Sequence, residues 1–420
     1  MHLENLLKNI RERFQAIPNE DRRAKLGTRD LISVLVFCFS RDRGNSRSLE
    51  SIRKALQNAL KINLSRSAFW ERLATVKLQE TLEAFACSLI QNISCKLSIT
   101  SQLLKVLKVS AVLLIDSSSS SLPKGAKKAF PAPRKNVAPA AIKLHLCFDL
   151  FKGAVEWFNL TEATSHDRMS FPPLQSLVGK LIIFDLGYWD YGLLAEIKKI
   201  GGFFLSRVKV NASIRVTKVI SGLPAKFEGR GLFDWRLPDK KSKIVEVIGQ
   251  FSLAYKPIFE ARVIGFWNAS TNQYHWYTTN LTAPAEMIYP LYRLRWQIEL
   301  IFKAFKSSFR LADIPTSNPR IIFSIVYSAL IANIIAHPVA HILAMEFKRN
   351  RQMTPSFQRA GMLIANTTSQ FIIFLLEGSK IELKNLKDAL ELQKRELFDP
   401  NFKKRETTLA GLIRMAEACA

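Results

Sequence analysis

The sequence has few acidic residues for its length. Its 420 residues include 35 Asp and Glu against 61 Lys and Arg, a formal net charge of 61 − 35 = +26. The hydrophobic share of 48% and the charged share of 23% are ordinary for a folded protein, so extensive disorder is not expected. A positive charge of this size predicts a polyanionic partner, either nucleic acid or an anionic membrane surface.

Cysteine is also scarce, and its spacing excludes a structural zinc site. The five cysteines form no CxxC pair and no ligand spacing with the six histidines; they are Cys38, Cys87, Cys95, Cys147 and Cys419. This pattern fits a reduced cytoplasm. Residues 1–14 have the pattern of an amphipathic helix and lack the apolar core of a signal peptide.

No uninterrupted apolar run is long enough to predict a membrane span. The most apolar stretch, residues 321–336, has sixteen residues and includes Ser, Tyr and Asn. Because a span needs about 20 apolar residues, we expect a buried core helix here and no membrane association. The sequence has no internal repeat.

Changes in the hydrophobic pattern divide the chain into five expected segments. Helical periodicity marks the two ends, and strand-like runs marked by turn residues fill the middle. The segments are a helical N-terminal DNA-binding domain (1–108), the first part of an α/β core (109–209), a β-rich insertion (210–282), the second part of the core (283–330) and a helical C-terminal region suited to dimerisation (331–420).

Two predicted buried strands each end in an aspartate. Residues 109–115 form a continuous apolar run that leads into Asp116, and residues 180–184 form a second run that leads into Asp185. Such runs are typical of strands buried on both faces. We expect the five serines that follow Asp116 to begin a loop that extends to residue 136.

A third acidic residue belongs to a predicted amphipathic helix over residues 287–311. Six apolar residues recur there at three- and four-residue steps: Leu291, Leu294, Ile298, Phe302, Phe305 and Phe309. Beside this stripe, within roughly 60° on a helical wheel, lie Tyr292, Arg295, Glu299 and Lys306. An ordinary solvated edge with an Arg295–Glu299 ion pair is the alternative interpretation.

The three acids together suit phosphoryl transfer with two metal ions. Such a site needs carboxylate oxygens to bind two divalent cations, and hard carboxylates favour Mg²⁺ or Mn²⁺. Asp116, Asp185 and Glu299 are the predicted ligands. The donors Tyr292, Arg295 and Lys306 on the same helix suit phosphate oxygens.

These residues give the chain a resemblance to the DDE transposases of the insertion-sequence-four family. The pattern Tyr292-x2-Arg295-x3-Glu299-x6-Lys306 matches the Y-(2)-R-(3)-E-(6)-K signature of that family at every position. The resemblance implies an α/β, RNase H-like mixed-sheet catalytic core with a β-rich insertion, flanked by helical N- and C-terminal regions. It covers residues 109–311, and the spacing of 299 − 185 = 114 positions from Asp185 to Glu299 leaves room for the insertion.

The resemblance also implies an activity, partners and a location. The activity is metal-dependent cleavage at the inverted-repeat ends of an insertion sequence, followed by strand transfer. A DNA-hairpin intermediate is implied by the insertion. The expected partners are double-stranded DNA at the transposon ends and at the target, with the protein acting as a homodimer on paired ends. The expected location is the bacterial cytoplasm, at the nucleoid.

The chain departs from the family pattern around the second aspartate. Further candidate DNA contacts lie outside the signature residues. Leu186 follows Asp185 where the family usually has a basic residue, and two serines follow Asp116. Tyr188 is a candidate DNA contact. The loop after the serines either contacts DNA or is a solvated tip; its basic residues are Lys124, Lys127, Lys128, Arg134 and Lys135. Trp267 and Trp276 are expected to pack within the insertion, with base stacking as the alternative.

Two other functions share these features. A metal-dependent nuclease of the same fold would use the same carboxylates without strand transfer. A non-catalytic DNA-binding derivative would keep salt-sensitive DNA binding without needing the metal. The presence of all three carboxylates favours an active enzyme.

Overall fold

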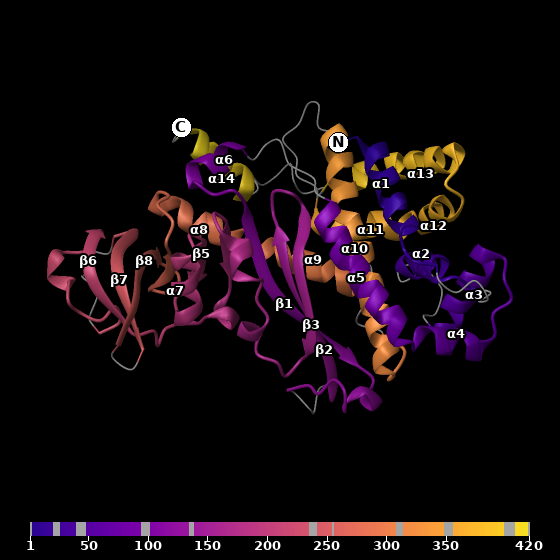
Figure 1. The fold of residues 1–420 in the computed structure, drawn as a ribbon. Helices are drawn as coiled ribbons and strands as arrows, with labels where there is room; N and C mark the ends of the chain where they lie inside the picture. Colours follow the sequence, from indigo (N-terminus) through magenta and orange to yellow (C-terminus); the bar gives the residue numbers. More distant parts are fainter. Residues whose placement is uncertain are drawn as a thin grey trace.

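The structure is a computed structural model, and its described residues form one large sheet with helices gathered mainly at one end (Figure 1). The described residues are 2–19, 26–38, 48–93, 101–133, 138–234, 242–253, 256–307, 314–347, 356–398 and 408–418. The strands are β1 (Val112–Leu122), β2 (Ala140–Asp149), β3 (Ala154–Glu162), β4 (Leu181–Phe184), β5 (Phe203–Arg207), β6 (Ile214–Ser221), β7 (Ile244–Leu253), β8 (Lys256–Asn268) and β9 (Gln273–Thr279).

The first five strands have the RNase H-like arrangement, which confirms the expected fold class. The sheet order is β3-β2-β1-β4-β5-β9-β8-β7-β6. β1, β2 and β3 pair antiparallel, whereas β4 is parallel to both β1 and β5. The β-rich insertion continues this same sheet, because β9 pairs antiparallel with β5 and β6 to β8 extend the sheet outwards.

Both faces of the central strands are buried, as the continuous apolar runs predict. Along β1, Val112 and Leu114 join one apolar core while Leu113 and Ile115 join the other. Helix α7 (Tyr191–Lys199) covers the second face with Leu194. The first face is covered by α8 (Ala285–Arg293), α9 (Trp296–Ser307) and α10 (Pro319–Phe347).

The N-terminal and C-terminal helices pack together around α10. They are α1 (Leu3–Gln15), α2 (Thr28–Cys38), α3 (Leu49–Leu60), α4 (Arg66–Leu73), α5 (Val76–Asn92), α6 (Ser101–Leu107), α11 (Phe357–Asn366), α12 (Thr368–Glu377), α13 (Lys380–Gln393) and α14 (Thr408–Ala418). α10 contacts α1, α2, α4, α5 and α11, whereas α6 and α14 pack on each other.

Helix α10 contains the apolar run at 321–336. By length and composition it is the one helix among the described residues that could cross a membrane, and 94% of its most apolar window is buried inside the protein. A helix packed in this way is the core helix that the sequence predicts. The second candidate, α11 with α12, is bent by 61° at its break.

The predicted loop after Asp116 is wrong over its first residues. β1 continues through the serines to Leu122, because β2 supplies an antiparallel partner for every residue from Leu113 to Leu122. A 3₁₀ turn, η2 (Lys124–Ala126), follows. Cross-strand pairing here overrides the low strand preference of a serine run.

The prediction of one helix over 287–311 is also wrong. α8 and α9 are separate, and at the junction Leu294 N–H bonds to Leu291 O while Arg295 N–H bonds to Tyr292 O. These bonds span three residues instead of four, so the helix tightens there. The predicted edge is therefore split between two helices. Residues 308–311 lie outside the described residues.

Candidate active site

Three parallel strands deliver polar residues to one edge of the sheet. In the parallel registers, Leu114 is opposite Ile183, and Phe184 is opposite Ser206. Each register, continued along the strands, sets Asp116 beside Asp185 and Asp185 beside Arg207. Because β4 and β5 end there while β1 continues, the edge opens at these side chains, as it does at ligand sites of other parallel sheets.

Arg295 ties the first aspartate to the helical glutamate. Its Nη1 donates to Asp116 Oδ2 at 2.8 Å, and its Nη2 donates to Glu299 Oε1 at 2.6 Å. Only 17% of the Arg295 side chain and 16% of the Asp116 side chain are exposed. By strand alternation Asp116 lies on the same sheet face as Leu114, which is the face that α9 covers. The expected convergence of strand and helix is thus a direct contact.

The negative charges of the carboxylates repel one another. Burial, together with the negative charge of Asp185, raises the pKa of Asp116 to about 6. The charge of Glu299 acts in the same direction, while the Ser117 backbone N–H and Arg295 oppose it. Repulsion between acids that share a site is what a bound cation relieves.

An open hollow of about 520 Å³ surrounds these groups. It is lined by Asp116, Ser117, Ser118, Asp185, Arg295, Glu299, Phe302, Lys303, Lys306 and Ser307. Asp116 and Asp185 lie on the strand side, whereas Glu299 and the two lysines lie along α9. Partial burial lowers the pKa of Lys306. A negatively charged base with a basic rim suits a metal-bound phosphate group.

The residues fit the expected metal in donor type, while Arg295 separates them. Among the described residues, no three His, Cys, Asp or Glu side chains lie together closely enough to hold a metal ion. The Arg295 guanidinium is bonded to both Asp116 and Glu299. Three carboxylates, two of them repelling each other, remain a set of hard oxygen donors suited to Mg²⁺ or Mn²⁺.

A fourth acid, Asp167, borders the site and was not among the predicted site residues. It belongs to the short 3₁₀ turn η3 (Asp167–Met169), and its Oδ1 accepts from Ser117 Oγ at 2.9 Å and from Lys143 Nζ at 3.0 Å. A methyl group on Gly187 would meet both Asp167 Oδ2, at 2.8 Å, and Asp185 Oδ1, at 3.0 Å. Asp167 and Asp185 therefore face the same side of Gly187.

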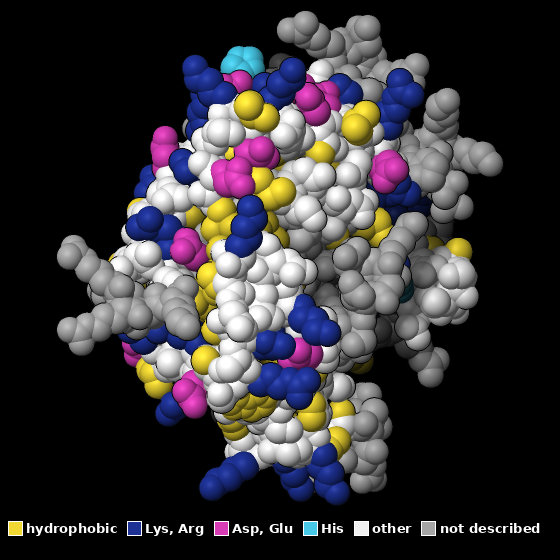
Figure 2. Space-filling view, turned by 90° about the vertical axis from the view of Figure 1, so that its right-hand side faces the viewer, with side chains coloured by type: hydrophobic (Ala, Val, Ile, Leu, Met, Phe, Trp, Pro, Cys, Tyr) yellow, Lys and Arg dark blue, Asp and Glu magenta, His cyan; other side chains and the backbone are white. Residues whose placement is uncertain are grey.

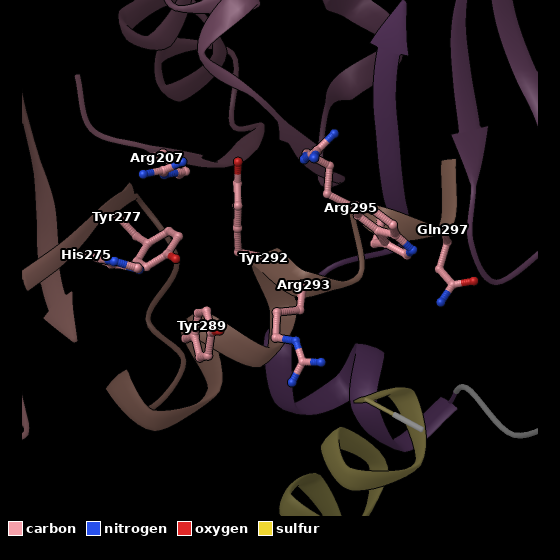
Figure 3. A pocket seen from close by; sticks show the side chains of 9 residues that line it. Arg207, His275, Tyr277, Tyr289, Tyr292, Arg293, Arg295 and Gln297 are labelled. Atoms are coloured by element: carbon pink, nitrogen blue, oxygen red, sulfur yellow. The ribbon is translucent and has the colours of Figure 1, made fainter. Parts of the chain in front are cut away.

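A second hollow, of about 440 Å³, adjoins the first through Arg295. It is lined by Arg207, His275, Tyr277, Tyr289, Tyr292, Arg293, Arg295, Trp296 and Gln297. Figure 3 shows Tyr292 pointing between Arg207 and Arg295, with Tyr277 and Tyr289 at its side. The ring centroids of Tyr277 and Tyr292 are 5.0 Å apart. Aromatic rings beside guanidinium groups suit stacking with a nucleobase and contact with its phosphate.

The same residues fall within a known protein family. Residues 108–334, more than half of the chain, match the family described as transposase DDE domain. The chain belongs to this family. Membership of the transposase DDE domain family implies an enzyme of DNA phosphoryl transfer.

Relatives of this transposase domain come from bacterial insertion sequences. The chain is 24% identical over 264 residues to the transposase for IS1151 of Clostridium perfringens, which covers 52% of the chain and 55% of that protein. It is 22% identical over 338 residues to the transposase for IS231B of Bacillus thuringiensis subsp. berliner, covering 69% and 71%. The chain spans about half the length of most of the curated relatives it matches.

Among solved structures, the chain is similar to a piggyBac transposase in a synaptic complex with hairpin DNA. The similarity covers 92% of this chain and 81% of that chain, with a TM-score of 0.43 and 10% sequence identity.

Tyr188, which was predicted to contact DNA, lies inside the transposase domain. Tyr188 is fully buried, and its hydroxyl lies 3.2 Å from His145 Nδ1, so it is a core residue and the predicted DNA contact is wrong for this conformation. Its ring packs against Phe171 and Phe184 because β4 runs directly into the 3₁₀ turn η5 (Leu186–Tyr188).

The basic loop lies away from the acids. Lys124, Lys127 and Lys128 are exposed at the tip that follows β1. Lys124 lies 124 − 116 = 8 positions beyond Asp116, along and just past the end of β1, which corresponds to about 25 Å at the usual strand rise. Arg134 and Lys135 lie outside the described residues. In the insertion, Trp267 and Trp276 pack against the apolar core of the sheet, in keeping with the expected packing role.

Proposed function

We propose that the protein binds the inverted-repeat ends of an insertion sequence, cleaves the phosphodiester bonds there and joins the ends to target DNA. The observation that supports this most directly is the meeting of Asp116, Asp185 and Glu299 around Arg295, within a transposase DDE domain. We also propose membership of the insertion-sequence-four family, which the Tyr292, Arg295, Glu299 and Lys306 spacing supports.

The three acids are the proposed ligands of two Mg²⁺ or Mn²⁺ ions. When bound, such ions lower the pKa of the attacking water or hydroxyl and stabilise the charge on the leaving oxygen. Within the protein, release of Asp116 and Glu299 by Arg295 would free Asp116 Oδ2 and Glu299 Oε1 for the ions. The released guanidinium remains at the rim of both hollows, where it would orient the scissile phosphate together with Lys306.

The tyrosine-lined hollow is the proposed place for the terminal nucleotide of the cleaved strand. Trp296 is 59% exposed at its mouth, so its ring can stack on a base without rearrangement of the core. Arg207 stands next to Asp185 in register and would hold the adjoining phosphate. Displacing one base from the duplex suits the hairpin intermediate that the family resemblance implies.

The proposed partners are double-stranded DNA and a second copy of the protein. The net charge of +26 supports binding to the phosphate backbone, and two ends must be held together for joining. The relatives of this chain are transposases for insertion sequence elements, which supports the same assignment. The bacterial cytoplasm at the nucleoid remains the proposed location.

A gel assay with the full-length protein tests this proposal. The substrate is a labelled duplex that carries the terminal inverted repeat flanking the gene, supplied with Mg²⁺ and a supercoiled target plasmid. Cleavage at the repeat boundary and labelled plasmid products are expected. Cleavage without joined product would indicate the nuclease alternative. Binding without cleavage, in Mg²⁺ and in Mn²⁺, would indicate the non-catalytic derivative.

A further inference from the structure

The N-terminal region contains two short helices joined by a tightly built turn. α3 ends at Lys61, which adopts the left-handed conformation with φ 53° and ψ 39°. α4 begins after Ser65, whose hydroxyl accepts from Ala68 N–H. Only three residues, 62–64, lie between these two caps. Two helices joined by a short turn are the elements from which a helix-turn-helix unit is built.

Polar contacts fix the angle between the two helices. Arg53 of α3 donates to the Leu64 carbonyl in the turn, and Gln57 donates to Asn63 at 3.3 Å. Glu50 accepts from Arg53 and also from Arg66 Nε, at 3.1 Å, so it joins the start of α3 to the start of α4. These contacts tie the two helices and the turn to one another.

The inner faces of the unit are anchored to the rest of the protein. The buried side chains are Ile52, Leu56, Leu64, Phe69 and Leu73, all in the main apolar core. α4 packs on α10, and Ser324 Oγ of α10 donates to the Leu73 carbonyl at 3.2 Å. Arg72 donates to Thr28 Oγ1 of α2 at 3.0 Å.

The outer face of α4 carries exposed side chains. Arg66 keeps 81% of its side chain exposed despite the bond to Glu50, and Trp70, one turn later, is 42% exposed. Ser67 and Ala68 beside them are exposed as well. The basic residues Lys54 and Lys61 are exposed on α3 and the turn. Lys and Arg outnumber acidic side chains over this face of the molecule (Figure 2).

We propose that α3, the turn and α4 form a helix-turn-helix unit that reads the sequence of duplex DNA, with α4 in the major groove. This inference rests on the proposed binding of inverted-repeat ends and assigns their recognition to one element. A guanidinium and a hydroxyl at the start of the helix match the donors and acceptors on base edges. Lys54 and Lys61 contact the flanking phosphates, and the Trp70 ring packs against the groove wall.

In the catalytic domain no described group plays this part. The two hollows there contain the proposed metal ligands, phosphate donors and stacking rings, and such groups would act on any sequence. Sequence recognition needs an element that reaches base edges in an intact duplex, and an exposed helix of two turns fits the major groove.

In vitro selection from a pool of duplexes with a randomised centre tests the proposal on the full-length protein. Wild type is expected to select one sequence, and Arg66→Ala is expected to lose the preference at one or two adjacent base pairs of it. Affinity for the selected duplex should fall about 10- to 100-fold in Arg66→Ala and in Trp70→Ala at fixed salt. Affinity for an unrelated duplex should change less than about threefold.

Lys384→Ala is the matched control, because Lys384 is exposed on α13, outside the unit. This substitution should lower the affinity for both duplexes to the same small extent. Trp70→Phe keeps an aromatic ring and should retain most of the affinity, which separates a contact from a folding defect. Thermal unfolding of each variant provides the second check on folding.

The outcomes distinguish this inference from the proposed function. If Arg66→Ala and Trp70→Ala select the wild-type sequence with unchanged affinity, α4 does not recognise the DNA sequence. The proposed binding of the inverted-repeat ends is not affected by that result. If they lose self-association in sedimentation while keeping DNA affinity, the face is a contact between two copies and the inference is overturned. If wild type selects no sequence, specific end binding itself fails.

Discussion

Arg295 donates a hydrogen bond to Asp116 Oδ2 at 2.8 Å, although the two residues are 179 positions apart in the chain. The same guanidinium binds Glu299, four residues further along, so one cation holds two of the three acids. Arg295 also lines both hollows. Its position therefore couples the site of the carboxylates to the site proposed for the terminal nucleotide.

Replacing Arg295 by Ala should lower the rate of cleavage more than the affinity for DNA. If the guanidinium orients the scissile phosphate, its loss misplaces the reacting group, which costs on the order of 100-fold in rate. Single-turnover cleavage at saturating DNA measures this effect directly.

Lys124→Ala is the control for that measurement, because Lys124 is exposed about 25 Å along β1 from Asp116. A phosphate contact there should reduce the salt dependence of binding by about one counterion and leave the saturated rate unchanged. If Arg295→Ala cleaves at the wild-type rate, Arg295 only holds α9 against the sheet and does not orient the scissile phosphate.

Removing any one of the three acids should abolish cleavage while leaving end binding largely intact. Asp116→Ala, Asp185→Ala and Glu299→Ala each delete a proposed metal ligand. A loss of roughly 100-fold or more is expected, since even outer partners of a metal site typically contribute 10- to 100-fold. Titration with Mn²⁺, followed by electron paramagnetic resonance, provides a readout independent of cleavage.

The matched control for these variants is Asp190→Ala. Asp190 is a nearby acid that caps α7 by accepting from Leu193 N–H, and it is not among the residues that line the carboxylate hollow. It should lose some stability, about 1 kcal/mol as for other helix caps, and keep its Mn²⁺ binding. An acid whose loss leaves cleavage within about tenfold of wild type does not belong to the site.

Much of this site follows from local sequence pattern. Apolar runs that end in Asp116 and Asp185 predict strand ends, and parallel pairing then places those ends side by side. Arg207 follows the same rule at the end of β5, so a pattern that could have identified it was present. Glu299 follows from helical spacing, although the break at 294–295 places Tyr292 on α8 and Glu299 on α9.

The remaining features depend on contacts between distant segments. No periodicity marks Asp167, because it belongs to a three-residue turn and is defined by Ser117 and Lys143 on two other segments. The serine run became strand because β2 lies beside it, which the run itself does not encode. Tyr188 has the sequence context of a surface contact, and only the packing of η5 buries it.

Replacing Gly187 by Ala should impair cleavage through Asp185. The added methyl group would lie 2.8 Å from Asp167 Oδ2 and 3.0 Å from Asp185 Oδ1, both too close, while Gly187 N–H holds Asp185 Oδ1 at 2.8 Å. A displacement of about 1 Å in a ligand can cost on the order of 100-fold in rate. The measurement is single-turnover cleavage, with thermal unfolding to report stability.

Gly192→Ala is the control for Gly187→Ala. Gly192 lies in the first turn of α7, and its added methyl group would approach only Asp190, at 3.1 Å. Cleavage by this variant should match wild type. Equal losses of cleavage in both variants would show that the effect is not specific to the two carboxylates beside Gly187.

Stability should depend on pH through His145, which is fully buried beneath the site. Burial lowers the pKa of His145 to about 4, although the carboxylate of Asp167 acts in the opposite direction. The unfolded chain keeps a histidine pKa of about 6.5 and so binds more protons than the folded protein between pH 6.5 and 4. The stabilisation is complete above pH 6.5 and is lost as pH falls through this window.

The difference between wild type and His145→Gln isolates this contribution. Gln can still bond to Tyr188 and Thr161, the two partners of His145, but it cannot take up a proton. Relative to this variant, the free energy of unfolding of wild type should fall by up to about 3 kcal/mol between pH 7 and 4. Urea unfolding at a series of pH values measures it, with the exposed His166→Gln as control. Parallel stability curves for wild type and His145→Gln would show that His145 titrates alike in the folded and unfolded states.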